Sequence, residues 1–143
     1  MRYETSVEID ASPENVWTVL VDVERWPAWT ASMTSVRLLR PEPFMVGSAA
    51  RIKQPKLPPA VWRVTDFQPG RSFSWVAKGP GVATTASHTV TARDGGDGAV
   101  VTLGLVQGGP LAPIADLLLT RLTRRYMRIE ATGLKRRCEP QDS

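Results

Sequence analysis

The amino-acid sequence predicts an α+β protein in which a long C-terminal helix packs against an antiparallel sheet. Three observations indicate this class: a strand and two short helical segments open the chain, six strand-like runs follow, and an amphipathic helix closes it. A sheet with one apolar face and a helix with one apolar stripe each need a covering layer, so the two are expected to pack together. The length of 143 residues suits one domain with a single core.

The first elements are a half-buried strand and a pair of short helices. Residues 3–10, "YETSVEID", alternate in character, which is typical of a strand with one face in the core. In "ASPENVWTVLVD", Ser12 is a suitable N-cap and Pro13 fits the first helical position. Pro27 disfavours one continuous helix, because the residue before a proline avoids helical angles. Residues 22–29 are therefore expected to form a second short helix or turn.

Six further runs have the character of strands and are separated by turn residues. They lie at about 33–40, 48–54, 60–68, 71–78, 83–93 and 98–107. Pro69-Gly70, Gly79-Pro80-Gly81 and the "DGGDG" stretch at 94–98 mark turns. Consecutive short strands joined in this way predict an antiparallel meander.

The last element is a long helix over about residues 111–136. Pro113 falls in its first turn, where proline is tolerated. Apolar or small residues recur at helical spacing and give the helix one apolar side, which is expected to lie on the sheet. They are Ala115, Leu118, Leu119, Leu122, Tyr126, Ile129 and Gly133.

Composition argues against several classes of protein. No apolar run approaches the length of a membrane span, and the N-terminal residues lack the apolar segment of a signal peptide. Cys138 is the only cysteine, so an internal disulfide is not possible. These features together predict a cytoplasmic protein.

The net charge of +4 is concentrated near the C-terminus. Such a pattern is typical of the solvent face of a helix, whose C-terminal end favours cations. The alternative is a surface that meets an acidic partner. Nucleic acid is not expected, because the basic residues are not interleaved with exposed aromatic residues. The basic residues are Arg121, Arg124, Arg125, Arg128, Lys135, Arg136 and Arg137.

Two stretches carry a resemblance to a known superfamily. "VEIDASPENVWTVLVDVERWPAW" and the hairpin "VWRVTDFQPGRSFSW", in this element order, resemble the START-like, or SRPBCC, superfamily. That superfamily includes the Bet v 1-like proteins and the polyketide cyclase/dehydrase and lipid transport group. The resemblance implies a helix-grip fold, with about seven strands wrapped around the long helix, a START-like domain over 1–138 and a tail over 139–143. It also implies a deep cavity between sheet and helix.

The sheet face that meets the helix carries mostly large apolar side chains, with Gln54 and His88 as its polar members. Ligand sites have this composition, although such residues can also simply fill a core. Trp26 is expected to lock the helical pair to the sheet and Trp29 to reach the cavity, with "PKLPP" and "KGPGVA" at its mouth. The expected ligand-binding residues are Trp29, Met33, Ile52, Gln54, Trp62, Phe73, Trp75, His88, Leu103, Leu118, Leu122 and Tyr126.

His88 and Tyr126 are the candidates for catalysis. His88 is the only histidine, and its ordinary pKa suits acid–base chemistry near neutrality; the alternative is a buried histidine satisfied by Tyr126 or water. One His and one distant Cys are too few for a zinc site, so no metal is expected. No G-x-S-x-G elbow or strand-linked G-x-G-x-x-G is present, and no cofactor is expected.

Three functions follow as hypotheses. The first is binding of a hydrophobic or aromatic small molecule, lipid or polyketide-like, in the cavity. The second is a polyketide cyclase, aromatase or dehydratase that uses the same cavity, with His88 as acid or base and Tyr126 or Gln54 orienting a carbonyl. The third is an interaction protein that uses the basic helix face. A fold alone does not decide between such functions, and the sequence leaves the oligomeric state open.

Overall fold

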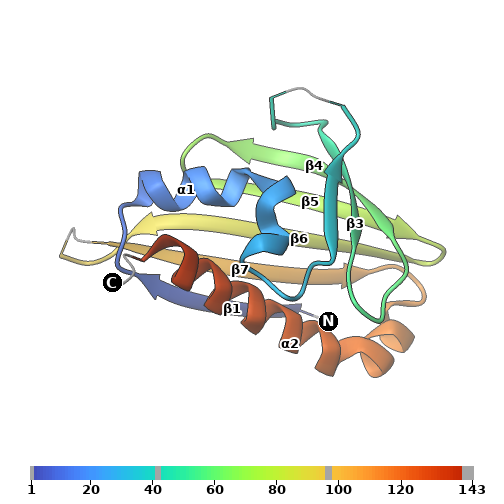
Figure 1. Cartoon of the computed structure of the whole chain (residues 1–143). Coiled ribbons are helices and arrows are strands. Elements are labelled where there is room, and N and C mark those ends of the chain that lie inside the picture. Colours follow the sequence, from blue (N-terminus) through green and yellow to red (C-terminus); the bar gives the residue numbers. More distant parts are fainter. Residues whose placement is uncertain (1, 41–42, 96–97, 140–143) are drawn as a thin grey trace.

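The computed structural model describes residues 2–40, 43–95 and 98–139. The predicted element order is confirmed (Figure 1). The helices are α1 (Pro13–Val21), the 3-10 helix η1 (Val23–Ala28) and α2 (Ala112–Cys138). The strands are β1 (Arg2–Ile9), β2 (Ser35–Leu38), β3 (Ala49–Lys53), β4 (Ala60–Gln68), β5 (Ser72–Gly79), β6 (Val82–Ala92) and β7 (Ala99–Gly108).

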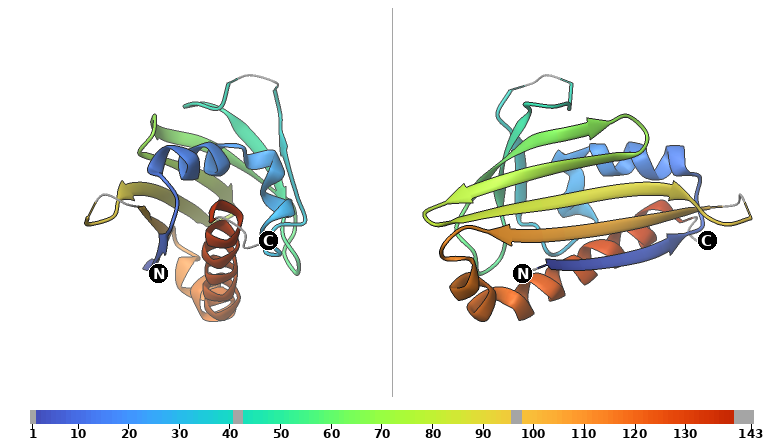
Figure 2. Two further views of the ribbon diagram at one scale, coloured as in Figure 1. Left: turned by 60° about the vertical axis from the view of Figure 1, so that its left-hand side comes forward. Right: turned by 180° about the vertical axis from the view of Figure 1, so that it is seen from behind.

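The strands form one seven-stranded sheet with the order β1-β7-β6-β5-β4-β3-β2. Every neighbouring pair is antiparallel. The meander from β2 to β7 therefore returns to β1, and α2 packs on the β1 and β7 end of the sheet. Figure 2 shows the sheet curving around one side of α2, with α1 and η1 beside it. This arrangement is the predicted helix-grip fold.

Turn chemistry explains where several strands end. The β4–β5 turn contains Gly70 with a φ of 77°, and the β5–β6 turn contains Gly81 with a φ of 76°. Glycine adopts these angles without the steric cost that a side chain adds. The predicted turn at 94–98 includes residues 96–97, which lie outside the described residues, as do residues 140–143 of the predicted tail.

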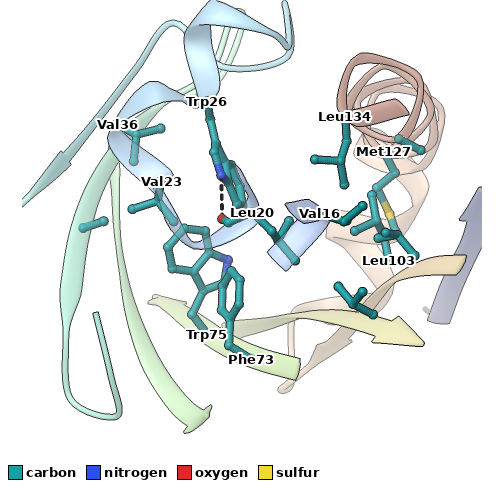
Figure 3. Close-up of a cluster of buried hydrophobic side chains, with 14 of the residues drawn as sticks. Val16, Leu20, Val23, Trp26, Val36, Phe73, Trp75, Leu103, Met127 and Leu134 are labelled. Atoms are coloured by element: carbon teal, nitrogen blue, oxygen red, sulfur yellow. Dashed lines mark hydrogen bonds between the residues drawn. The ribbon is translucent and has the colours of Figure 1, made fainter. Parts of the chain in front are cut away.

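The two short helices are tied together by local hydrogen bonds. The Ser12 side chain accepts a hydrogen bond from the Asn15 backbone N–H at 3.2 Å, which caps α1 as predicted. Trp26 Nε1 donates to the Leu20 carbonyl at 2.9 Å, and both residues are fully buried. Figure 3 shows this bond and the Trp26 ring extending from η1 toward Trp75 and Phe73 of β5. The bond fixes η1 against the end of α1.

One part of the interior is densely packed with aromatic rings. Phe73 is fully buried, and its ring centroid lies 5.0 Å from that of Phe44 and 6.4 Å from that of Trp17. Phe67 completes the group at 5.7 Å from Trp17. These tilted and edge-on contacts are the geometries that aromatic pairs prefer. Trp17, Phe44, Phe67 and Phe73 are called the aromatic core below.

α2 approaches the chain after η1 more closely than a side chain would allow. A Cβ atom on Gly133 would lie 2.1 Å from the Trp29 carbonyl oxygen. Glycine therefore lets α2 rest directly on this backbone, and Met127, Ala131 and Leu134 on the same helix are buried. The close contact sets the distance between α2 and the helical pair.

The N-terminal half of α2 exposes much of its apolar surface. Leu117 is 85% exposed and Leu118 is 74% exposed. The arginines Arg121, Arg124, Arg125 and Arg128 are exposed as well. Among the described helices, none is both long and apolar enough to cross a bilayer.

Candidate functional site

A pocket lies between the concave face of the sheet and α2. Its volume is about 180 Å³. The sheet wall comes from β3 to β7, the helical wall comes from α2, and Trp26, Ser32 and Met33 line it from η1 and the segment after it. The pocket therefore occupies the place that the superfamily resemblance implies for a cavity.

The strand register assembles the sheet wall. Trp75 of β5 pairs with Ala86 of β6, which pairs with Leu105 of β7. Residues that pair directly across neighbouring strands share one face of a sheet. Because the side-chain period of a strand is two, His88 and Leu103 lie on this face as well.

Helical periodicity assembles the opposite wall. Leu119, Thr123, Tyr126, Met127 and Glu130 of α2 line the pocket. Their spacing of three, four, seven and eleven residues keeps them on one side of an α-helix. Two members of this stripe, Thr123 and Glu130, are polar.

Eight of the twelve ligand-binding residues predicted from the sequence line the pocket. They are Met33, Ile52, Gln54, Trp62, Trp75, His88, Leu103 and Tyr126. Four do not, namely Trp29, Phe73, Leu118 and Leu122. Members outside the predicted set are Trp26, Ser32, Leu57, Thr84, Ala86, Ser87, Gly104, Leu105, Gln107, Leu119, Thr123, Met127 and Glu130.

Of the two tryptophans of "ERWPAW", Trp26 takes the place expected from the sequence and lines the pocket as well. Trp26, expected to lock the helical pair to the sheet, bonds to Leu20 of α1, packs its ring 5.3 Å from that of Trp75 of β5, and is part of the pocket lining. Trp29, expected to reach the cavity, is the C-cap of η1 and packs its ring 5.7 Å from that of Trp26. Its backbone lies against Gly133 of α2, and its ring is not part of the pocket lining.

The three other predicted residues that do not line the pocket are kept out of it for separate reasons. Phe73 stacks on the His88 ring with the centroids 4.2 Å apart and an interplanar angle of 11°, so it supports the wall from the aromatic core. Leu118 faces outward, and Leu122 is half-buried beside the lining stripe. On α2, the residues that line the pocket include Leu119 and Thr123, one position after the predicted Leu118 and Leu122. The inward side of the helix carries polar residues and its outward side carries leucines, which is the reverse of the pattern that the prediction assumed.

Glu130 is the functional candidate that the sequence reasoning missed. It is 8% exposed, and its Oε1 atom has no hydrogen-bond partner among the described residues. A charged residue on an arginine-rich helix is expected to face solvent, so the sequence did not identify Glu130 as part of a site. One signal was available in the sequence: Glu130 is the only acidic residue from 117 to 138, and it lies at helical spacing from Tyr126 and Gly133 of the predicted apolar stripe.

His88 is held in a neutral state with one ring nitrogen facing the pocket. Its Nδ1 lies 3.4 Å from the Phe73 carbonyl oxygen, which can only accept, so Nδ1 carries the proton of this weak hydrogen bond. Burial lowers the pKa of His88 to about 4, although the bond to Phe73 opposes the shift. Nε2 is therefore left as an unprotonated acceptor at neutral pH.

Glu130 is also neutral near pH 7. Burial raises the pKa of its carboxyl to about 8, since an ionised carboxylate is poorly solvated in this position. Its Oε1 atom lies 3.9 Å from His88 Nε2. This separation exceeds a hydrogen bond, so the two groups face each other without a direct bond.

Two other polar side chains of the pocket lining donate hydrogen bonds to backbone carbonyls. The Tyr126 hydroxyl donates to the Pro55 carbonyl, so it does not serve as the partner of His88. Gln54 Nε2 donates to the Ser32 carbonyl at 3.3 Å. Within the described ranges, no group of three or more His, Cys, Asp or Glu residues is arranged to hold a metal ion.

This architecture, a sheet that grips a long helix over an apolar pocket, is the Bet v 1-like helix-grip fold. Residues 1–139 match the family described as polyketide cyclase / dehydrase and lipid transport, and the chain belongs to that family. Nearly the whole chain takes part in the match.

Solved structures show the same fold at low sequence identity. The major latex-like protein 151 of Panax ginseng is 11% identical, with a TM-score of 0.81 over 98% of each chain. A START superfamily protein from Mycobacterium smegmatis is 16% identical, with a TM-score of 0.76 over 96% of each chain. The XoxI protein of Bacillus cereus is 17% identical, with a TM-score of 0.77 over 96% of this chain and 94% of that one.

Sequence similarity to curated proteins is confined to a short segment. An uncharacterized protein from Mycobacterium tuberculosis is 35% identical over 46 residues, which is 32% of this chain and 28% of that protein. The matched part thus spans little more than a quarter of the relative. The name of the relative states no activity.

Proposed function

We propose that the protein binds a small hydrophobic molecule, most readily an aromatic one, in the pocket between the sheet and α2. The observation that carries this proposal is the wall itself. Trp26, Trp62 and Trp75 supply large apolar surfaces, and polar side chains such as Gln54, His88 and Glu130 are placed among them. Mostly apolar walls with a few placed polar groups are the usual character of small-molecule sites.

The pocket volume limits the size of the ligand. Sites for drug-sized ligands usually enclose roughly 300–1,000 Å³, whereas this pocket holds about 180 Å³. An engineered apolar cavity of about 150 Å³ in another protein admits benzene. The volume therefore suits a molecule of one or two rings better than a long-chain lipid.

We also propose that the protein is located in the cytoplasm.

Two alanines of β6 provide a matched test. Ala86 lines the pocket. Ala83 lies three positions earlier in the same strand, and because side chains alternate along a strand, it lies on the opposite face of the sheet. Ala86→Phe is expected to fill the pocket and weaken binding of a one- or two-ring aromatic at least tenfold, measured by calorimetry. Ala83→Phe is expected to leave the affinity unchanged. Equal affinities of both folded variants and the parent would contradict a ligand site in this pocket.

An enzyme is the second candidate, favoured by the facing pair of His88 and Glu130 inside the pocket. Two buried titratable groups with pKa values shifted in opposite directions are a recurrent feature of acid–base sites. A cyclase, aromatase or dehydratase reaction on a ring-forming substrate would use such a pair. His88→Gln is then expected to lower turnover by about 10²–10⁴ while binding is retained, and unchanged turnover would reject this role.

A further inference from the structure

The facing atoms of His88 and Glu130 leave a gap that one further atom would fill. His88 Nε2, on β6, and Glu130 Oε1, on α2, are 3.9 Å apart and both residues line the pocket. An oxygen atom forms hydrogen bonds at about 2.8 Å, so a single oxygen placed to one side can reach both atoms. Oε1 has no other hydrogen-bond partner among the described residues.

The protonation of the two groups determines what that oxygen must be. His88 Nδ1 donates to the Phe73 carbonyl, so Nε2 can only accept. A protonated Glu130 donates through its carboxyl hydrogen. A group bound between them must therefore accept one hydrogen bond and donate another through the same oxygen. A ligand hydroxyl does both, as a water molecule does, whereas an ether or carbonyl oxygen can only accept.

We propose that His88 and Glu130 form a hydroxyl-binding end of the pocket, and that the ligand is a one- or two-ring aromatic alcohol or phenol. The inference rests on the proposed binding function and names its ligand class. The ligand hydroxyl accepts from Glu130 and donates to His88 Nε2. Its ring lies along the apolar wall that includes Trp75 and Leu103.

The surroundings of the pair favour this selectivity. Phe73 stacks on the imidazole at 4.2 Å and the Trp26 ring lies 5.4 Å from it, so the orientation of His88 is fixed before binding. Both polar side chains are almost fully buried. A ligand without a hydroxyl would leave them unpaired in apolar surroundings, and sites of this kind discriminate strongly against such analogues.

Three related compounds test the proposal without any variant. 2-Naphthol carries a hydroxyl, 2-methoxynaphthalene can only accept a hydrogen bond, and naphthalene can do neither. By calorimetry at pH 7, with protein titrated into ligand, 2-naphthol is expected to bind about 10- to 100-fold more tightly than either analogue, because each added buried hydrogen bond contributes up to roughly one factor of ten.

Equal affinities for the three compounds would overturn the hydroxyl site and leave the proposed aromatic binding intact. Binding of none of them would overturn both. The two failures are therefore distinguishable.

Two variants test whether Glu130 causes the preference for 2-naphthol over naphthalene. Glu130→Leu is expected to reduce the preference for 2-naphthol over naphthalene by about tenfold, with naphthalene binding retained, because the donor is lost while the His88 acceptor remains. Glu130→Gln keeps a neutral donor of similar shape and is expected to retain most of the preference. An unchanged preference in a folded Glu130→Leu protein would overturn the assignment to this residue. Complete loss in Glu130→Gln would overturn the donor role and indicate that the carboxylate acts in its charged form.

Discussion

The aromatic core and the pocket are neighbouring parts of one interior that differ in how completely they are filled. In the aromatic core, Phe73 is fully buried and ring contacts surround it on several sides. In the pocket, about 180 Å³ stays open although Trp26 and Trp75 at its boundary are just as deeply buried. Both regions carry large aromatic residues, but in the aromatic core the rings fill the space between them, whereas at the pocket they leave part of it open. Changes in the two regions should therefore affect different measurements.

The largest expected effect is on stability, from a truncation in the aromatic core. Phe73→Ala should lower the free energy of unfolding by about 3–5 kcal/mol, since it removes a buried ring and leaves a cavity. Trp62→Ala, in the pocket wall where the ring is only partly buried, should cost less stability and more affinity. Urea unfolding measures both. A smaller stability loss for Phe73→Ala than for Trp62→Ala would remove the distinction between the two regions.

The second effect concerns the contact that sets the spacing of α2. Alanine is a better helix former than glycine, so Gly133→Ala would stabilise an isolated helix. Here the new Cβ would meet the Trp29 carbonyl oxygen at 2.1 Å, and we expect a net loss of about 1–3 kcal/mol, as for other overpacked sites. Thr132→Ala, at an exposed position of the same helix, is the control and should change stability by less than about 0.5 kcal/mol. Stabilisation by Gly133→Ala would mean that α2 is not seated as described.

The pH dependence of stability tests the neutral state of Glu130. Folding raises the pKa of this carboxyl from 4.5 to about 8, so its favourable contribution is complete below pH 4.5 and is lost as the pH rises through about 8. His88 acts in the opposite sense, with a contribution that is present above pH 6.5 and lost as the pH falls toward 4. Between pH 6.5 and 8 only the Glu130 effect remains.

The protein should therefore lose about 1–2 kcal/mol of stability as the pH rises from 6.5 to 8. Glu130→Gln should remove this decline, because the amide does not ionise. Unfolding curves at several pH values provide the measurement. The same decline in both proteins would show that another group causes it.

The smallest effect is expected at the exposed leucines of α2. Leu118→Ser, at a side chain that is 74% exposed, should change stability by less than about 0.5 kcal/mol and leave ligand affinity unchanged. Calorimetry on the folded variant checks both values. A loss of affinity would place Leu118 in the site after all and contradict the assignment of the wall to Leu119.

The sequence predicted the sheet and its inward face well, because strand alternation follows local composition. Ile52, Trp62 and Trp75 were assigned correctly to one face by this rule. The helix was harder: the hydrophobic period assumes that polar residues face water, and Glu130 does not. The backbone of Trp29 lies against Gly133 of α2, a tertiary contact that no local pattern contains. The polar pair thus became visible only once β6 and α2 were placed together.

The indole N–H signals of the five tryptophans offer the most direct test of the central claim. Trp26, Trp62 and Trp75 line the pocket, whereas Trp17 and Trp29 do not. On titration with 2-naphthol, a ¹⁵N-edited NMR spectrum should show clear shifts of the first three signals and little change in the other two. Shifts confined to Trp17 and Trp29, or equal shifts of all five, would contradict binding in the pocket between the sheet and α2.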